Sequence, residues 1–235
     1  MYYPMFWDPT YILVLIGVVI CMAASAKVKS TFHRYSYVKN HMGMTGREAA
    51  ERVLRQAGIT DVRIERVSGN LTDHYDPRSK VLRLSDSTYN STSVSAVGVA
   101  AHECGHAIQH AAHYAPLSIR GAIVPIANFG STIAWPLIIM GLFIGGNSSA
   151  LLINLGILAF SASVLFQLVT LPVEFNASGR AIRVLGTTGM LNEDELHAAK
   201  KVLGAAAFTY VAGAASAILQ LLRILILTGG RRRDD

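Results

Sequence analysis

Four apolar segments alternate with polar stretches along the chain. Residues 121–173 contain no Asp, Glu, Lys or Arg, and residues 202–222 form a second uncharged run. A helix needs about 20 apolar residues to cross a bilayer, so the first run is long enough for two spans and the second for one. A fourth apolar segment ends just before Lys27. The pattern therefore predicts transmembrane helices over residues 10–26, 121–145, 150–171 and 202–222.

Turn and helix-breaking residues divide these segments. Residues 145–149, Gly-Gly-Asn-Ser-Ser, predict a tight polar turn between the second and third spans. Pro172 predicts that the third span ends or bends there. A polar loop is then expected over residues 172–201, and Asn192 with Glu195 forms a capping-box pattern at the start of the last helix.

The first apolar segment has two interpretations. Ala24-Ser25-Ala26 resembles the cleavage site of a signal peptide, but such a peptide begins with a positively charged region. No Lys or Arg precedes the segment, whereas Lys27 and Lys29 follow it. This order favours an uncleaved anchor whose C-terminal side stays in the cytoplasm.

Residues 27–120 combine charged and polar residues with patterns typical of helices and strands. Thr45 and Glu48 form a capping box ahead of a short helical pattern. Residues 62–67 and 80–84 alternate between apolar and polar side chains with period two, which predicts two strands. Small and apolar residues from Ser93 to Ala112 then recur at helical spacing.

The composition supports a membrane protein. Hydrophobic residues make up 51% of the 235 positions and charged residues 15%, against about 25% charged in an average soluble domain. This balance excludes intrinsic disorder, which combines low hydrophobicity with high net charge. Cys21 and Cys104 form no paired motif, so no disulfide is expected.

The net charge of +6 is unevenly distributed. Most of the 21 Lys and Arg residues lie within residues 27–120 and 174–201. They are not interleaved with aromatic residues, so nucleic acid is not expected as a partner. Basic loops mark the cytoplasmic side of a membrane protein, which places both stretches in the cytoplasm. The basic tail Arg231-Arg232-Arg233 opposes this orientation, because four spans would place it outside.

Residues 102–106 read His-Glu-Cys-Gly-His and carry the chemistry of the chain. On a helix, residues four apart point the same way, so His102 and His106 can bind one metal ion. Zn²⁺ held by three protein ligands keeps a position for water, and Glu103 can act as general base on that zinc-bound water. The helix is otherwise apolar, so these polar side chains would be costly there without a function.

A third zinc ligand must come from elsewhere in the sequence. Gln109 and Ala112 stand where a longer histidine motif would place its glycine and its third histidine. Glu174 ends the uncharged run, and a carboxylate at a membrane boundary is a candidate functional group. Two predicted spans separate it from the histidine motif, so both lie on the same side. The alternative is an interfacial Glu174 paired with Arg180 or Arg183.

Several long motifs accompany the histidine motif, at residues 73–78, 80–85, 102–110, 114–117 and 168–178. Together they resemble the YugP-type membrane zinc metallopeptidases, a family similar to the HtpX-like membrane proteases. The likeness extends from about residue 2 to about residue 227. It implies that Glu174 is the third ligand. At Ser178 the chain departs from the HtpX-like pattern, in which an Asp orients a ligand histidine, so Ser178 and Asn176 are alternatives for that role.

Other polar residues are weaker candidates. Tyr114, Tyr210 and His74 could each stabilise an oxyanion, and their spacing selects none of them. His110 and His113 continue the histidine face, and we interpret His110 as a polar interface residue.

Three further assignments concern the surroundings of the motif. Arg180 is expected to brace Glu174 if that stretch is helical. Cys104 points away from the metal face of the helix and is expected to pack in the core. The strand at residues 81–84 is expected to be an edge strand that binds substrate in extended form, in preference to residues 62–67.

These patterns predict a mainly α, integral membrane protein with about four transmembrane helices. A small α+β, zincin-like catalytic portion is expected between the first and second spans, within a single domain. The expected function is a zinc-dependent, multi-pass cell-membrane endopeptidase that acts on peptide or protein substrates. The alternative is a non-catalytic membrane scaffold or adaptor that retains a structural metal site. A structural zinc site is closed by four protein ligands, so a set of three favours catalysis.

Overall fold

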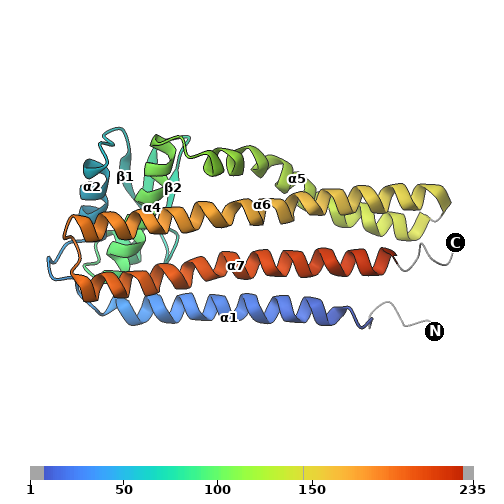
Figure 1. The fold of residues 1–235 in the computed structure, drawn as a ribbon, viewed down its shortest axis with the longest axis horizontal. Helices are drawn as coiled ribbons and strands as arrows, with labels where there is room; N and C mark the ends of the chain where they lie inside the picture. The colour runs from blue at the N-terminus through green and yellow to red at the C-terminus, as the bar shows by residue number, and fades with distance from the viewer. Residues whose placement is uncertain (1–7, 145, 230–235) are drawn as a thin grey trace. The chain divides into compact units, whose positions relative to one another are not determined.

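The computed structural model describes residues 8–144 and 146–229 (Figure 1). Its elements run in the order α1 (Tyr11–Ser36), α2 (Gly46–Gln56), β1 (Arg63–Val67), β2 (His74–Asp76), β3 (Val81–Ser85), α3 (Asp86–Tyr89), α4 (Val94–Ala111), α5 (Ala115–Ile144), α6 (Gly146–Thr187) and α7 (Glu193–Gly229). The predominance of helix confirms the fold class that the sequence predicts.

Four helices, α1, α5, α6 and α7, are long and apolar enough to cross a membrane. Each extends beyond the apolar segment that predicts it, because polar residues continue the helix at one or both ends. The basic tail Arg231-Arg232-Arg233 lies outside the described residues, and so does Gly145, the first residue of the turn predicted between the second and third spans.

The turn predicted before the third span and the helix end predicted at Pro172 are wrong. Residues 146–149 form the first turn of α6 and not a polar turn. The same helix continues through Pro172, so Glu174 lies on a helix and not in a loop. Proline removes one backbone donor, and long membrane helices tolerate that loss when neighbouring groups satisfy the freed carbonyl.

The chain divides into two compact units, each built from separate stretches of sequence. The first, which we call the helical unit, comprises Met1–Ala23, Ser118–Leu171 and Thr209–Asp235. The second, the mixed unit, comprises Ala24–Leu117 and Pro172–Phe208. All three strands and the histidine motif belong to the mixed unit.

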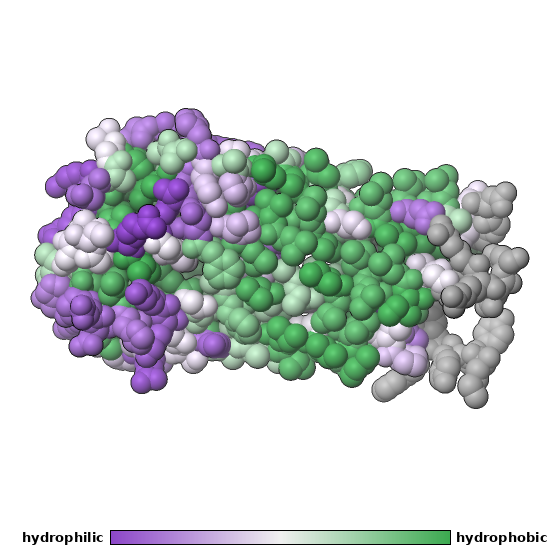
Figure 2. All heavy atoms as spheres, in the orientation of Figure 1, coloured by the Kyte–Doolittle hydropathy of each residue, from purple (hydrophilic) through white to green (hydrophobic). Residues whose placement is uncertain are grey.

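The helical unit exposes its large apolar side chains. Phe129, Phe143 and Leu158 are among them, and apolar side chains cover the visible face of these helices (Figure 2). Helices α5 and α6 approach closely at Gly130, where an added Cβ would lie 2.4 Å from the Ala159 carbonyl oxygen. Exposed apolar surface with small residues at the helix contacts is typical of packing within lipid.

The mixed unit contains a three-stranded sheet in the order β1-β3-β2. β3 is parallel to β1 and antiparallel to β2, so it is the central strand. The prediction that residues 81–84 form a substrate-binding edge strand is therefore wrong. β2 was not predicted, because three residues are too few to show an alternating pattern, and it forms one edge of the sheet while β1 forms the other.

The core of the mixed unit lies where α2, α4 and the sheet meet, and in Figure 1 these elements are drawn side by side. Thr45 and Glu48 form the predicted capping box at the start of α2. Ser93 caps α4 by accepting a hydrogen bond from the Ala96 backbone N–H. The two caps satisfy backbone donors at the helix starts and so define where each helix begins.

Candidate metal centre

Helix α4 presents the histidine motif to α6. Cys104 faces the core, where its Sγ lies 3.6 Å from the Ala50 carbonyl oxygen, while Gly105 faces α6. An added Cβ at Gly105 would lie 2.5 Å from the Ala177 carbonyl oxygen, so only glycine permits this approach. The close contact brings the His102 and His106 face of α4 against the side chains of α6.

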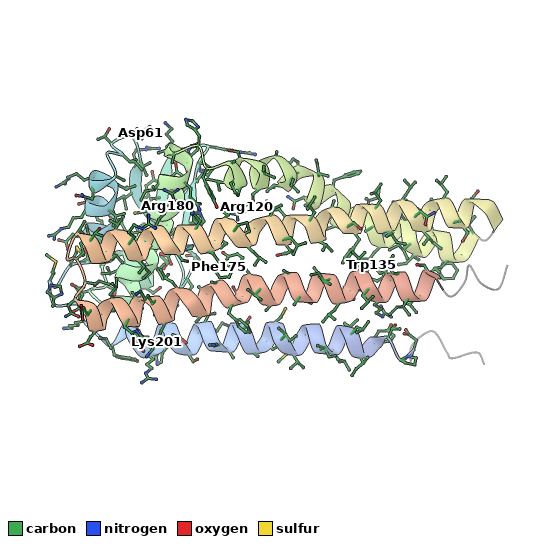
Figure 3. All side chains as sticks on the ribbon, in the orientation of Figure 1. Asp61, Arg120, Trp135, Phe175, Arg180 and Lys201 are labelled. Atoms are coloured by element: carbon green, nitrogen blue, oxygen red, sulfur yellow. The ribbon has the colours of Figure 1, made fainter. Side chains whose placement is uncertain are left out.

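Three side chains converge at this contact. His102 and His106 come from α4, and Glu174 comes from α6. Glu174 Oε2 lies 3.3 Å from His102 Nε2 and 3.5 Å from His106 Nε2. Glu174 is only 2% exposed, so it is not the interfacial side chain of the alternative interpretation. The next residue on α6, Phe175, is 51% exposed and is labelled in Figure 3.

The spacing of these donors fits zinc. Zinc bonds of about 2.0–2.1 Å at tetrahedral angles place neighbouring ligand atoms about 3.3–3.4 Å apart. The two distances to Glu174 are 3.3 Å and 3.5 Å, and the three donor atoms all lie within 4.8 Å of one another. Two imidazole nitrogens and one carboxylate oxygen are also the donor types that zinc selects.

The electrostatics of the site favour a positive charge. Burial alone would lower the pKa of His106, but the hydrogen bond with Glu174 and the charges of Glu103 and Glu174 outweigh it and raise that pKa above its ordinary value. The same carboxylates that stabilise a proton on the imidazole would stabilise a metal cation in its place.

The outer nitrogens of both histidines have partners. His102 Nδ1 lies 3.0 Å from Ser178 Oγ, one turn after Glu174 on α6. His106 Nδ1 lies 3.0 Å from Oε1 of Gln109. Hydrogen bonds of this kind orient a ligand imidazole so that Nε2 points at the metal. Ser178 thus lies where the HtpX-like pattern has its Asp, while Asn176 bonds Gln109 instead.

Glu103 lies beside the edge strand β2. Its Oε2 accepts a hydrogen bond of 3.1 Å from the Tyr75 backbone N–H. β2 is anchored in turn by Asp73, which accepts hydrogen bonds from the Ser85 N–H and hydroxyl, each of 2.8 Å. The strand that the sequence did not predict therefore holds the candidate general base.

Some of the weaker candidates have other contacts. Arg180 donates a 2.7 Å hydrogen bond to Asn176 Oδ1 and lies over the Tyr114 ring. His110 Nδ1 lies 2.9 Å from the Tyr75 hydroxyl. His74 is exposed on β2, where its Nδ1 lies 2.9 Å from the Thr72 carbonyl oxygen.

The prediction that Cys104 packs in the core is confirmed. Burial raises the pKa of the Cys104 thiol, so the side chain is a neutral core residue, as predicted. Of the candidates for stabilising an oxyanion, Tyr210 lies on α7.

Sequence reasoning gave no role to two residues of the site. Gln109 was noted only as a departure from a longer histidine motif, although its position three residues after His106 places it on the same helix face. Tyr75 lies within the motif at residues 73–78 that resembles the family. Its contact with Glu103 runs through the backbone, so no side-chain pattern could have indicated it.

Comparison with known proteins shows the family of the chain. The family model described as "Putative neutral zinc metallopeptidase" matches residues 10–229. The chain belongs to this family. It is also 48% identical over 209 residues to a protein of Bacillus subtilis (strain 168) named "Putative membrane protease YugP". That alignment covers 88% of this chain and 92% of the relative. No solved structure matches the chain.

These matches confirm the resemblance that the sequence motifs carry. The matched region includes His102, His106 and Glu174 together with all four long apolar helices. The family description names zinc, which fits the donor set of this chain, and the relative's name gives a membrane location, which fits the four apolar helices.

Proposed function

We propose that the chain is a zinc-dependent membrane endopeptidase that hydrolyses peptide bonds in peptide or protein substrates. The observation that carries the proposal is the set formed by His102, His106 and Glu174, whose donor atoms have the spacing of zinc ligands. Three protein ligands leave a fourth position for water or substrate, which is the arrangement of catalytic zinc sites.

The residues around this set have distinct proposed roles. When bound, zinc supplies a Lewis acid that lowers the pKa of water to about 7 and polarises the scissile carbonyl. Glu103 takes a proton from the attacking water and delivers it to the leaving amine. The Tyr75 N–H holds the Glu103 carboxylate at 3.1 Å, which fixes the direction of the base.

The edge strand β2 is the proposed binding site for the substrate backbone. It pairs with β3 on one side, and the Tyr75 N–H on its other side reaches Glu103. A peptide lying in extended form beside this edge would have its backbone next to the base, and main-chain hydrogen bonds to edge groups other than the Tyr75 N–H would make cleavage tolerant of sequence.

The proposed location is the cell membrane, with the lipid bilayer around the four apolar helices and the active site in the cytoplasm. The four helices of suitable length support the multi-pass arrangement. The concentration of Lys and Arg within residues 27–120 and 174–201 supports the cytoplasmic side, because basic loops are retained there.

Hydrolysis of an unfolded protein by the purified full chain in detergent tests the proposal. Glu103→Gln should abolish cleavage while leaving about one zinc per chain, since Glu103 is a base and not a ligand. Glu51→Gln is the matched control, because Glu51 lies on α2 and pairs with Arg47 at 2.8 Å. We expect this control to keep full activity.

The scaffold alternative makes the opposite forecast. A wild-type protein that holds zinc but cleaves neither an unfolded protein nor a broad peptide library would support a structural site. Undiminished cleavage by Glu103→Gln would remove Glu103 from the mechanism.

A further inference from the structure

The geometry points to Gln109 as a positioning residue that fixes the proton of His106 on Nδ1 and so presents the Nε2 lone pair to the metal. Asn176 and Arg180 hold Gln109 in this orientation. The inference rests on the proposed zinc site and adds Gln109, Asn176 and Arg180 to it.

Gln109 is fully buried, with no exposed surface. A buried amide is costly unless its polar atoms are hydrogen-bonded. Here its Oε1 faces His106 Nδ1 at 3.0 Å, and its Nε2 reaches both the Val173 carbonyl oxygen at 2.8 Å and Asn176 Oδ1 at 3.0 Å. The side chain therefore bonds His106 within α4 and joins α4 to α6 through the two hydrogen bonds of its Nε2.

The direction of these bonds follows from donor and acceptor chemistry. A backbone carbonyl can only accept, so the amide group that faces Val173 must be the NH₂ group of Gln109. The other end of the amide, Oε1, also can only accept. His106 Nδ1 must then carry the proton, which leaves Nε2 without one in the neutral imidazole and free to bind a metal.

Arg180 fixes the other end of this chain of bonds. A guanidinium group can only donate, so the Asn176 atom at 2.7 Å from Arg180 Nε must be the amide oxygen. That oxygen is the one that accepts from Gln109. Figure 3 labels Arg180 on α6, one turn after Asn176. Each link thus determines the orientation of the next, from Arg180 through Asn176 and Gln109 to His106.

The other histidine has no such constraint from its partner. His102 Nδ1 lies 3.0 Å from Ser178 Oγ, and a hydroxyl can donate or accept. Ser178 therefore orients the His102 ring without selecting its tautomer. The tautomer of His106 is therefore fixed by its partner, whereas that of His102 is not. The series of hydrogen bonds that begins at Arg180 ends at His106.

A purely structural role for Gln109 makes a different forecast. If the amide only fills the α4–α6 contact, its loss should lower stability without changing zinc affinity or the His106 ring proton. The experiment therefore needs measurements on the zinc site itself, beyond activity.

Zinc affinity of the purified full chain in detergent, measured by competition with a chromophoric chelator, is the first readout. Gln109→Leu should weaken zinc binding by about 10–100-fold, the range for residues that orient metal ligands. Asn176→Leu should act in the same direction. Asn176→Asp keeps an oxygen for both Gln109 and Arg180 and should bind zinc like the wild type. Gln167→Leu, a change of the same type on α6 within the helical unit, is the matched control and should also bind like the wild type.

Proton NMR of the zinc-loaded protein is the second readout. A protected imidazole Nδ1–H is expected in the wild type and in Asn176→Asp, and its loss or rapid exchange is expected in Gln109→Leu. A folded Gln109→Leu protein whose zinc affinity stays within twofold of the wild type would overturn the inference. If that variant does not fold, the difference between Asn176→Leu and Asn176→Asp decides, and equal zinc affinities would overturn it. A wild type that binds no zinc would instead refute the proposed function.

Discussion

The helical unit and the mixed unit each contain a glycine at which two helices approach closely, but the two contacts position different groups. In each, a glycine lets two helices approach until a Cβ would clash with a carbonyl oxygen, at 2.4 Å from Ala159 for Gly130 and at 2.5 Å from Ala177 for Gly105. In the helical unit the contact joins two apolar helices. In the mixed unit it brings the His102 and His106 face of α4, a candidate metal-binding face, onto the Glu174 carboxylate of α6. The glycine permits a short distance between the two helices, and the neighbouring side chains determine which groups meet there.

The two units also differ in where their large apolar side chains lie. The helical unit exposes residues such as Phe143 and Leu158, whereas the mixed unit buries Leu82, Leu84 and Leu185. Lipid tails solvate apolar side chains as well as a protein core does, so burial gives the helical unit little driving force. The mixed unit follows the rule for water, in which burial of apolar surface stabilises the fold.

Glu174→Ala should have the largest effect on the site of the mixed unit. Removing an anionic ligand leaves only the two imidazoles, and we expect zinc affinity to fall by more than the roughly 100-fold seen when an orienting residue is lost. Chelator competition measures the change. A titration that overlays the wild type would exclude Glu174 as a ligand.

Leu84→Ala and Leu158→Ala sharpen the contrast between the units. Leu84 is fully buried and Leu158 is 69% exposed. The first change should lower the free energy of unfolding by about 2–5 kcal/mol through the cavity it leaves, and the second by less than about 0.5 kcal/mol, as is usual at the surface. Denaturant unfolding in detergent gives both values. Equal losses would mean that the outer face of the helical unit is packed like a core.

Gly105→Ala and Gly130→Ala test the two close helix contacts directly. Both add a methyl group against a backbone carbonyl, so both should lower the unfolding temperature. Only Gly105→Ala should also weaken zinc binding, by about tenfold, because separating α4 from α6 moves the histidines away from Glu174. Melting curves and zinc titrations of the same samples provide the measurement. A matching loss of zinc affinity in Gly130→Ala would contradict the separation of roles.

Ser178→Ala should have the smallest effect. It removes one neutral hydrogen bond to His102, and such a bond contributes about 0.5–1.5 kcal/mol. Zinc affinity should therefore fall by about tenfold or less and by less than in Gln109→Leu. A zinc titration of the two variants side by side makes the comparison. A larger loss in Ser178→Ala would reverse the proposed ranking of the two histidines.

Much of the fold follows from periodicity and end signals. The uncharged runs predict the long helices, the Thr45–Glu48 capping box predicts where α2 begins, and the helical spacing from Ser93 predicts α4, because these signals are local. Pro172 misled the prediction, since the cost of a proline depends on the groups around the helix and not on its own residue type. β2 was missed because its three residues are defined by pairing with β3.

The sequence by itself determined the family and the helices apolar enough to span a membrane, and it indicated His102, Glu103, His106 and Glu174 as candidate site residues. Only the tertiary structure decided how these groups are held. The burial of Glu174, the link from Gln109 to His106 and the hydrogen bond from Tyr75 to Glu103 depend on contacts between segments far apart in the chain. Residue types at local spacing specify which atoms can bind a metal, whereas helix and strand packing specifies where their lone pairs point.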